Sequence, residues 1–164
     1  MVNYFAVFGL NTGFDIDIDV LEKKYFEFQA QLHPDKAGVE EIEKSIKINE
    51  GYKVLVDDFL RCCHLLALQG FDILQDEKAI KVDQKILLEI LELQEQIADN
   101  KDLKKLDEWQ SWLNQNIKNL INLAKKNIDD KEMANAAQIL VKAKYYKKCL
   151  ADIKNKKKSL KNAT

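Results

Sequence analysis

Two ionisable side chains flank the only proline of the 164-residue chain, in His33-Pro34-Asp35. The proline ring fixes the backbone and removes a hydrogen-bond donor, so the imidazole and the carboxylate are held in a defined relation. A carboxylate presented in this way suits a bidentate contact with an arginine on another protein. An ordinary proline stop between polar residues would have the same sequence, so the tripeptide alone is compatible with both interpretations.

The thiols and imidazole of Cys62-Cys63-His64 raise the question of a metal site or a nucleophile. Consecutive helical positions point about 100° apart, so these three side chains cannot converge on one ion. A zinc site needs about four ligands, and the chain has no Cys-x-x-Cys or His-x-x-His spacing. We therefore expect buried thiols, no bound metal and no cofactor.

The remaining polar residues do not predict catalysis. Carboxylates are plentiful, but none lies in a glycine-rich or strand-end setting. His33 has no serine or cysteine placed to use it as a base, and the phosphate-binding pattern of a P-loop is absent. We expect no enzymatic activity.

A leucine-rich helix is predicted where "KILLEILELQEQIAD" begins at Lys85. Spacings of three and four residues place the following side chains on one strip of it: Leu88, Leu91, Glu92, Glu95 and Asp99. A second, apolar strip consists of Ile86, Ile90, Leu93 and Ile97. One apolar face is enough to join a small bundle, so the other implies a further neighbour. We expect Leu93 and Ile97 in the core and Leu88 and Leu91 at a binding surface.

Helical periodicity runs through the whole sequence and predicts an all-α fold, because five glycines and long apolar stripes leave little room for strands. Asn3 is expected to cap a short helix over 4–8, and Asp17 is expected to cap a second helix that ends near Leu32. The second helix carries one apolar stripe, formed by Leu21, Tyr25, Phe28 and Leu32.

A third helix is predicted over about 40–68. Asp57 and Asp58 would allow this helix to run unbroken. Its inward face is expected to hold Ile42, Ile46, Asn49, Tyr52, Val56, Phe59, Cys63 and Leu66.

The composition changes near Ala79, where three longer helices are predicted. We place them at about 79–98, 102–126 and 130–157, with Asp129 as the cap of the last one. A three-helix N-terminal domain would thus precede a three-helix bundle. The expected bounds are 1–70 for the first domain, 71–78 for a connector and 79–164 for the bundle.

Composition and charge narrow the classes of partner. A hydrophobic content of 46% with 32% charged residues is typical of a globular protein, and a net charge of -1 argues against nucleic acid as a partner. No apolar run is long enough to span a bilayer and the N-terminus has no basic leader, so we expect neither a membrane partner nor a secretory signal. Three cysteines, two of them adjacent, fit reduced thiols and a cytoplasmic protein.

Two further patterns have simple structural interpretations. The lysine-rich end, "KNKKKSLKNAT", is most simply a solvated, fraying helix end. Trp109 and Trp112 lie three residues apart on a predicted helix, a spacing that favours core or interhelix packing.

The turn and its flanking helices resemble the J-domain of DnaJ-type co-chaperones. The resemblance rests on the apolar stripe before the turn, on "HPDK" itself and on "INEGYKVL" in the following helix. It extends to the HscB (Jac1-like) subfamily, whose segments are similar in the same order to "YFAVFGL", "INEGYKVL", "LRCCHLLALQGFD" and "LLEILELQEQI". These segments spread over nearly the whole chain.

The resemblance implies an L-shaped protein, in which a J-domain, made of a helical hairpin plus a short first helix, precedes a C-terminal three-helix bundle. It also implies that the J-domain docks on a DnaK-type chaperone (HscA-like) and stimulates its ATPase. The positions that the resemblance assigns to chaperone binding are Lys23, Lys24, His33, Pro34, Asp35 and Lys36.

The resemblance further implies that the bundle binds an IscU-type iron–sulfur scaffold protein and delivers it to the chaperone. The positions that match the family's scaffold-binding residues are Leu87, Leu88, Leu91, Glu92, Glu95, Asp99 and Tyr145. Exposed leucines rimmed by carboxylates have the anatomy of a protein-binding hot spot. The protein itself is expected to hold no cluster.

Two other interpretations stay open at this point. A J-protein could have the same N-terminal chemistry and serve a different client. A metal-dependent enzyme that uses His33, Asp35 and the thiols is the alternative from another class, although the spacing of these residues disfavours it.

Overall fold

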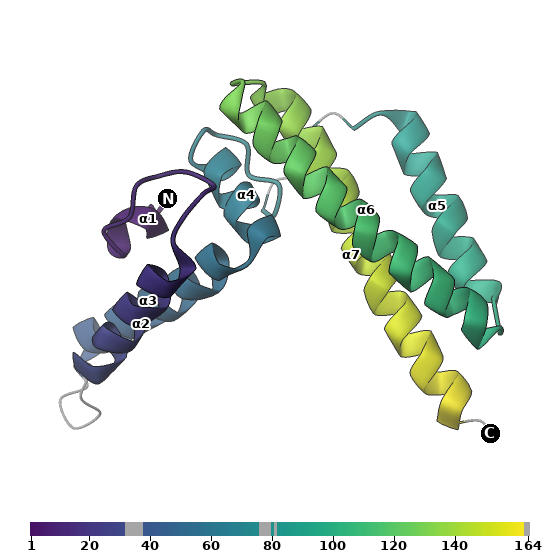
Figure 1. Ribbon diagram of the computed structural model, residues 1–164, viewed down its shortest axis with the longest axis horizontal. Helices are drawn as coiled ribbons and strands as arrows, with labels where there is room; N and C mark the ends of the chain where they lie inside the picture. The colour runs from purple at the N-terminus through teal and green to yellow at the C-terminus, as the bar shows by residue number, and fades with distance from the viewer. Residues whose placement is uncertain (32–37, 76–79, 81, 163–164) are drawn as a thin grey trace. The chain divides into compact units, whose positions relative to one another are not determined.

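The computed structural model describes residues 1–31, 38–75, 80 and 82–162, and every regular element in this part of the chain is an α-helix (Figure 1). The prediction of an all-α fold is confirmed. The chain divides into two compact units, Met1–Asp72 and Ile73–Thr164, which we call unit 1 and unit 2.

Helix α1 (Tyr4–Val7) begins unit 1 and is capped as predicted. The side-chain oxygen of Asn3 accepts hydrogen bonds from the backbone N–H of Phe5 at 3.0 Å and of Ala6 at 3.4 Å. Side-chain caps of this kind satisfy donors that have no partner inside the helix. Gly9, at φ 58°, lets the backbone leave the helix.

Helix α2 (Ile18–Gln31) is capped by Asp17, also as predicted, because its carboxylate accepts from the N–H of Val20 at 3.1 Å. Leu21 is fully buried, whereas Tyr25 and Phe28 are half-buried. Leu32, the last member of the predicted stripe, lies outside the described residues.

The predicted unbroken third helix is wrong, because two helices, α3 (Val39–Val56) and α4 (Asp58–Ala67), occupy this stretch. Asp57 between them has an extended backbone, and its carboxylate accepts from the N–H of Leu60 at 2.8 Å. Aspartate stabilises a helix better as a cap than in its interior, which explains why the chain breaks here. Unit 1 therefore contains four described helices rather than three.

The predicted inward face of this stretch is correct for α4 and wrong for α3. Phe59, Cys63 and Leu66 of α4 are buried. In α3 the buried residues are Ile48, Gly51 and Leu55, whereas Ile42 and Ile46 are each 51% exposed, and Asn49 and Val56 are also exposed. The face of α3 that packs is the one that carries Gly51, which meets the N-terminal segment, so the apolar periodicity of this helix did not identify its buried side.

A close approach between α1 and α3 accounts for the buried glycine. A Cβ atom at Gly51 would lie 2.9 Å from the ring of Tyr4 and 3.0 Å from the ring of Phe8. These distances are too short for a side chain, so the absent side chain lets the aromatic rings of the N-terminal segment lie directly on α3.

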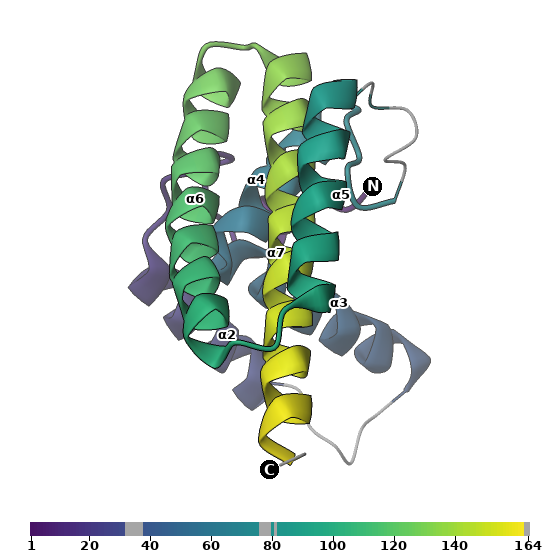
Figure 2. The same ribbon diagram turned by 90° about the vertical axis from the view of Figure 1, so that its right-hand side faces the viewer.

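Unit 2 contains helices α5 (Gln84–Asp99), α6 (Leu103–Asp129) and α7 (Met133–Asn162), and the predicted three-helix bundle is confirmed. Helix α7 packs against both α5 and α6 (Figure 2). Asp83 and Asp102 cap α5 and α6 through hydrogen bonds of 2.9 Å to the backbone of Lys85 and Lys104. Side chains that form the core include Ile90, Ile97, Leu106, Leu113, Leu140, Val141 and Ile153.

The predicted ends of α6 and α7 need correction. Helix α6 continues to Asp129, which we expected to cap the last helix, and α7 begins only at Met133, after Lys131 with φ 63°. Helix α7 then runs to Asn162, so the lysine-rich end is helical rather than frayed. Lys156 donates to the carbonyl of Ala98 on α5 and Lys157 pairs with Asp107 on α6, and both contacts hold this end of α7 against the other two helices of unit 2.

None of the described helices combines the length and the apolar composition that crossing a bilayer requires.

Candidate functional site

The outward face of α5 exposes a cluster of leucines. Leu87, Leu88 and Leu91 are 40%, 59% and 52% exposed, whereas Ile90 and Ile97 on the inward face are 3% and 2% exposed. The structure thus buries Ile97 and exposes Leu88 and Leu91 as predicted. The prediction for Leu93 is wrong, because this side chain is only half-buried and lines an open groove beside Trp112 instead of the core. Full burial of a leucine side chain contributes about 1.5–3 kcal/mol, so a partner protein that covers the three exposed leucines would gain substantial binding free energy.

Carboxylates border these leucines on the same helix. Glu92, Glu95 and Asp99 are all exposed. Spacings of three and four residues place them beside Leu88 and Leu91 along the helix. Tyr145, the seventh predicted position, is half-buried on α7, and the structure gives it a contact inside the protein. A polar rim around apolar anchors is the usual anatomy of a protein-binding patch.

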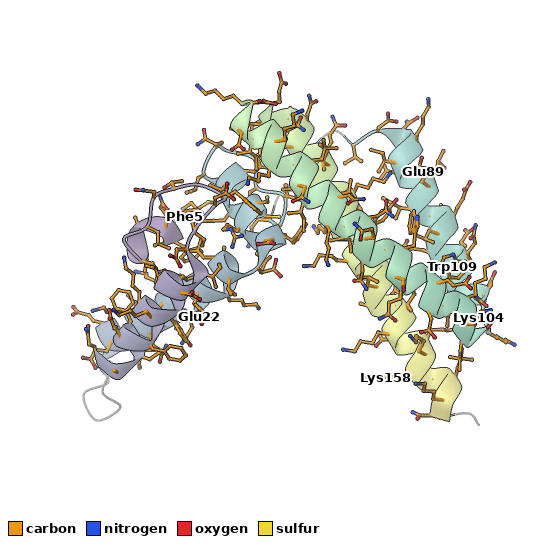
Figure 3. The ribbon with its side chains drawn as sticks, in the orientation of Figure 1. Phe5, Glu22, Glu89, Lys104, Trp109 and Lys158 are labelled. Atoms are coloured by element: carbon orange, nitrogen blue, oxygen red, sulfur yellow. The ribbon has the colours of Figure 1, made fainter. Side chains whose placement is uncertain are left out.

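An ion pair on α5 positions this helix against α7. Glu89 accepts a hydrogen bond from the ammonium group of Lys142 at 3.0 Å, and Figure 3 labels Glu89 on α5. Burial lowers the pKa of Lys142, but hydrogen bonds and charge interactions with Glu89 and Tyr146 outweigh this effect and raise its pKa above the ordinary value. Lys142 therefore stays charged and pairs α7 with α5 at this position, while the burial of Ile90 and Ile97 turns the leucines outward.

The predicted chaperone-binding turn, His33, Pro34, Asp35 and Lys36, lies outside the described residues. Of the two predicted lysines on α2, Lys23 is exposed. The ammonium group of Lys24 instead donates to the carbonyl of Phe8 at 2.7 Å and to that of Gly9 at 3.2 Å. Lys24 therefore stabilises the C-terminal end of α1, where a cation is favourable.

Aromatic and amide contacts join the two helices that flank this turn. The rings of Tyr25 on α2 and Tyr52 on α3 stack with centroids 4.1 Å apart. The side-chain oxygen of Asn49 accepts hydrogen bonds from the hydroxyl of Tyr25 and the amide of Gln29, each at 2.9 Å. These contacts fix the spacing of the helices that lead into and out of the turn.

The Cys62-Cys63-His64 segment is structural, and the prediction that its thiols are buried is confirmed. The ring of His64 lies 4.9 Å from that of Tyr4 and 5.7 Å from that of Phe5. Its Nε2 accepts a hydrogen bond from the backbone N–H of Tyr4 at 3.2 Å, and burial lowers the pKa of the imidazole. Within the described ranges, no three His, Cys, Asp or Glu side chains gather in a group that could hold a metal ion.

Arg61 is a structural residue that the sequence analysis missed. Its buried guanidinium donates to the carbonyl of Leu55 and to the carboxylate of Asp58, and lies 4.6 Å from the centre of the Phe14 ring. It closes the end of α3 after the break at Asp57. An aspartate three residues before an arginine, next to a break signal, is the pattern that could have predicted this pair.

Comparison with known proteins first identifies the C-terminal part of the chain. Residues 82–154 match the family model described as the HSCB C-terminal oligomerisation domain. Over 153 residues the chain is 31% identical to the co-chaperone protein HscB homolog of Psychromonas ingrahamii, which covers 88% of this chain and 90% of that protein. The chain belongs to the HscB co-chaperone family.

Other members of the HscB family support the same assignment. The iron-sulfur cluster co-chaperone protein HscB homolog of Arabidopsis thaliana is 28% identical over 162 residues, which are 94% of this chain and 64% of that protein. The crystal structure of the human co-chaperone protein HscB has a TM-score of 0.80 at 26% identity, and the match covers 96% of this chain and 83% of that one. The fold of a J-domain followed by a helical bundle, predicted from the sequence, is confirmed.

The match does not extend over the full length of every HscB relative. The match spans less than two thirds of several curated relatives, for example 62% of the co-chaperone protein HscB homolog of a Shewanella strain. These relatives are named as co-chaperones, which is consistent with a role other than catalysis.

Proposed function

We propose that this HscB-family protein binds an IscU-type iron–sulfur scaffold protein and delivers it to a DnaK-type, HscA-like chaperone. It then stimulates the ATPase of that chaperone and so assists iron–sulfur cluster assembly and transfer. The name of the Arabidopsis relative, an iron-sulfur cluster co-chaperone, supports this proposal. We place the protein in the cytoplasm, where its three buried cysteines would remain reduced thiols.

The leucine face of α5 is the observation that carries the scaffold-binding half of the proposal. Leu87, Leu88 and Leu91 are exposed to water, although the same helix buries Ile90 and Ile97. We assign the scaffold contact to these leucines together with the carboxylates around them and one tyrosine: Glu92, Glu95, Asp99 and Tyr145. Desolvated leucines would supply affinity and the acidic rim would supply specificity.

The chaperone contact is assigned to the N-terminal domain, for which we keep the bounds 1–70. The residues are His33, Pro34, Asp35 and Lys36 in the turn, with Lys23 and Lys24 on α2. Lys24 already donates to two carbonyls of unit 1, so we expect Lys23 to contribute more to the chaperone. Residues 71–78 would connect this domain to the scaffold-binding bundle, 79–164.

Joining both contacts in one chain explains the proposed mechanism. A scaffold held on α5 is brought to the chaperone at a raised effective concentration, without any new contact between scaffold and chaperone. The turn meanwhile shifts the chaperone towards ATP hydrolysis. The test is a steady-state ATPase assay with chaperone, scaffold and this protein, singly and together, and a stimulation that needs no contribution from this protein would contradict the proposal.

Asp35→Ala should remove the arginine-binding carboxylate and abolish ATPase stimulation while scaffold affinity stays near the wild-type value. Titration calorimetry with the scaffold measures the second quantity. Glu43→Ala is the matched control, because it removes an exposed carboxylate from α3 of the same unit. Equal stimulation by the Asp35 and Glu43 variants would exclude the turn as the chaperone contact.

Replacing both Leu88 and Leu91 by Ser should weaken scaffold binding by about 100-fold, because two exposed anchors are lost. Intrinsic ATPase stimulation without scaffold should be unchanged. The control replaces Leu103 and Leu123, two exposed leucines on α6, by Ser. If this control loses the scaffold as well, the binding surface does not lie on α5.

A further inference from the structure

A groove lined by lysines lies between α6 and the C-terminal half of α7. Its volume is about 460 Å³. Its walls consist of Lys154, Lys157, Lys158, Lys161, Leu150, Gln110 and Asn114. Figure 3 labels Lys158 on this part of α7. The groove belongs to different helices from the leucine face of α5, and the proposed function does not use it.

The lysines of this groove lie on one face of α7. Positions 154, 157, 158 and 161 are related by three, four and seven residues, so they share one side of the helix. Lys157 pairs with Asp107 and also donates to the side-chain oxygen of Gln110 at 2.8 Å. In the part of the chain that the structure describes, Lys154, Lys158 and Lys161 form no ion pair with a carboxylate.

This local charge contrasts with the chain as a whole, which has a net charge of -1. Neighbouring like charges on one helix face repel one another, and this repulsion is relieved when an anion binds. The helix dipole favours Lys161 in the last turn, but it falls off within one turn and does not explain Lys154. The groove therefore has an uncompensated positive field in an otherwise acidic protein.

We propose that this groove binds an acidic segment of a partner protein. The three unpaired ammonium groups would meet its carboxylates. The amides of Gln110 and Asn114 offer donors and acceptors for peptide groups, and Leu150 offers an apolar floor for a side chain. Isolated phosphates would leave the amide acceptors and Leu150 without a role. Nucleic acid fits less well, because none of the described residues that line the groove is an aromatic side chain on which a base could stack.

Binding of a fluorescein-labelled peptide rich in aspartate and glutamate, with one leucine, tests this proposal by anisotropy on the full chain. We expect saturable binding that weakens as salt is raised. Replacing Lys154, Lys158 and Lys161 by Gln should reduce the affinity by about ten-fold or more. In ¹H–¹⁵N spectra of the wild-type protein, the side-chain amide signals of Gln110 and Asn114 should shift when the peptide is added.

A second triple variant controls for net charge. Lys85, Lys104 and Lys126 are exposed residues outside the groove, and their replacement by Gln changes the net charge by the same amount. Equal loss of peptide binding in both triple variants would overturn the proposal, as would amide shifts confined to other residues. Tighter binding of a single-stranded oligonucleotide, of inorganic polyphosphate or of vesicles with anionic lipid than of the peptide would show that the occupant is not an acidic protein segment.

Discussion

Arg61 and His64 are buried inside unit 1, whereas the buried side chains described in unit 2 are aliphatic, thiol or phenol groups such as those of Leu140, Cys149 and Tyr146. A buried guanidinium or imidazole needs particular partners, and unit 1 supplies them through Asp58, a backbone carbonyl and the N–H of Tyr4. Unit 2 depends instead on apolar area along long helices. Few surface residues of unit 2 are therefore needed as partners for buried groups. The leucine face and the lysine groove both lie on this surface.

This difference can be measured because both tryptophans, Trp109 and Trp112, belong to unit 2. Tryptophan fluorescence therefore reports the unfolding of unit 2, and far-ultraviolet circular dichroism reports both units. A change confined to one unit should separate the two signals.

The largest expected effect is that of Leu140→Ala in the core of unit 2. Leu140 is fully buried, so its truncation should leave a cavity and lower the free energy of unfolding by about 3–4 kcal/mol. Urea titration followed by tryptophan fluorescence measures this change. Leu123→Ala, on the exposed surface of α6, is the control and should change the same quantity by less than about 0.5 kcal/mol.

Arg61→Ala should lower the free energy of unfolding of unit 1 by about 2–4 kcal/mol, since it leaves the carbonyl of Leu55 without its buried donor and removes the contact with Phe14. Circular dichroism should show an earlier unfolding phase, while the tryptophan transition keeps its midpoint. A shift of both transitions by the same amount would mean that the polar interior of unit 1 also stabilises unit 2. Lys53→Ala, on the exposed surface of α3, serves as the control.

The smallest expected effect is a dependence of the stability of unit 1 on pH. Burial lowers the pKa of His64, so the unfolded chain takes up this proton first as the pH falls. The contribution of neutral His64 to stability is fully present above about pH 6.5 and is lost as the pH falls from there through the lowered pKa. Unfolding of unit 1 followed between about pH 7.5 and 5.5 checks this expectation.

The variant His64→Gln should remove that pH dependence, because glutamine keeps an acceptor for the N–H of Tyr4 but does not titrate. Persistence of the same slope in this variant would assign the effect to another group. Unit 2 contains no histidine and should show no corresponding change in this range.

Local patterns predicted several parts of this molecule correctly. The caps at Asn3 and Asp17 were predictable because a side-chain oxygen bonds to a backbone N–H only two or three residues away. The two apolar strips of α5 were predictable because helical spacing alone separates them. The choice of which strip is buried agreed with the resemblance to HscB proteins, since Ile90 and Ile97 lie in the core and Leu88 and Leu91 on the surface.

Other features depended on interactions between distant segments. The packed face of α3 depends on the N-terminal segment, because the rings of Tyr4 and Phe8 lie against Gly51, and helical spacing alone did not predict it. The guanidinium of Arg61 likewise lies over the ring of Phe14, far earlier in the chain. The same holds for the end of α7, which stays helical where Lys156 and Lys157 bond to residues about fifty positions earlier. Such contacts require that the chain first be folded.

The sequence by itself determined the helical character of the chain, the caps at Asn3 and Asp17 and the amphipathic character of α5, because these follow from interactions within a few residues. Only the tertiary structure decided which face of α3 is buried, which lysine serves α1 and which lysines line a groove. These properties depend on the neighbours that each helix meets, and the burial of a side chain is a property of two surfaces rather than of one segment.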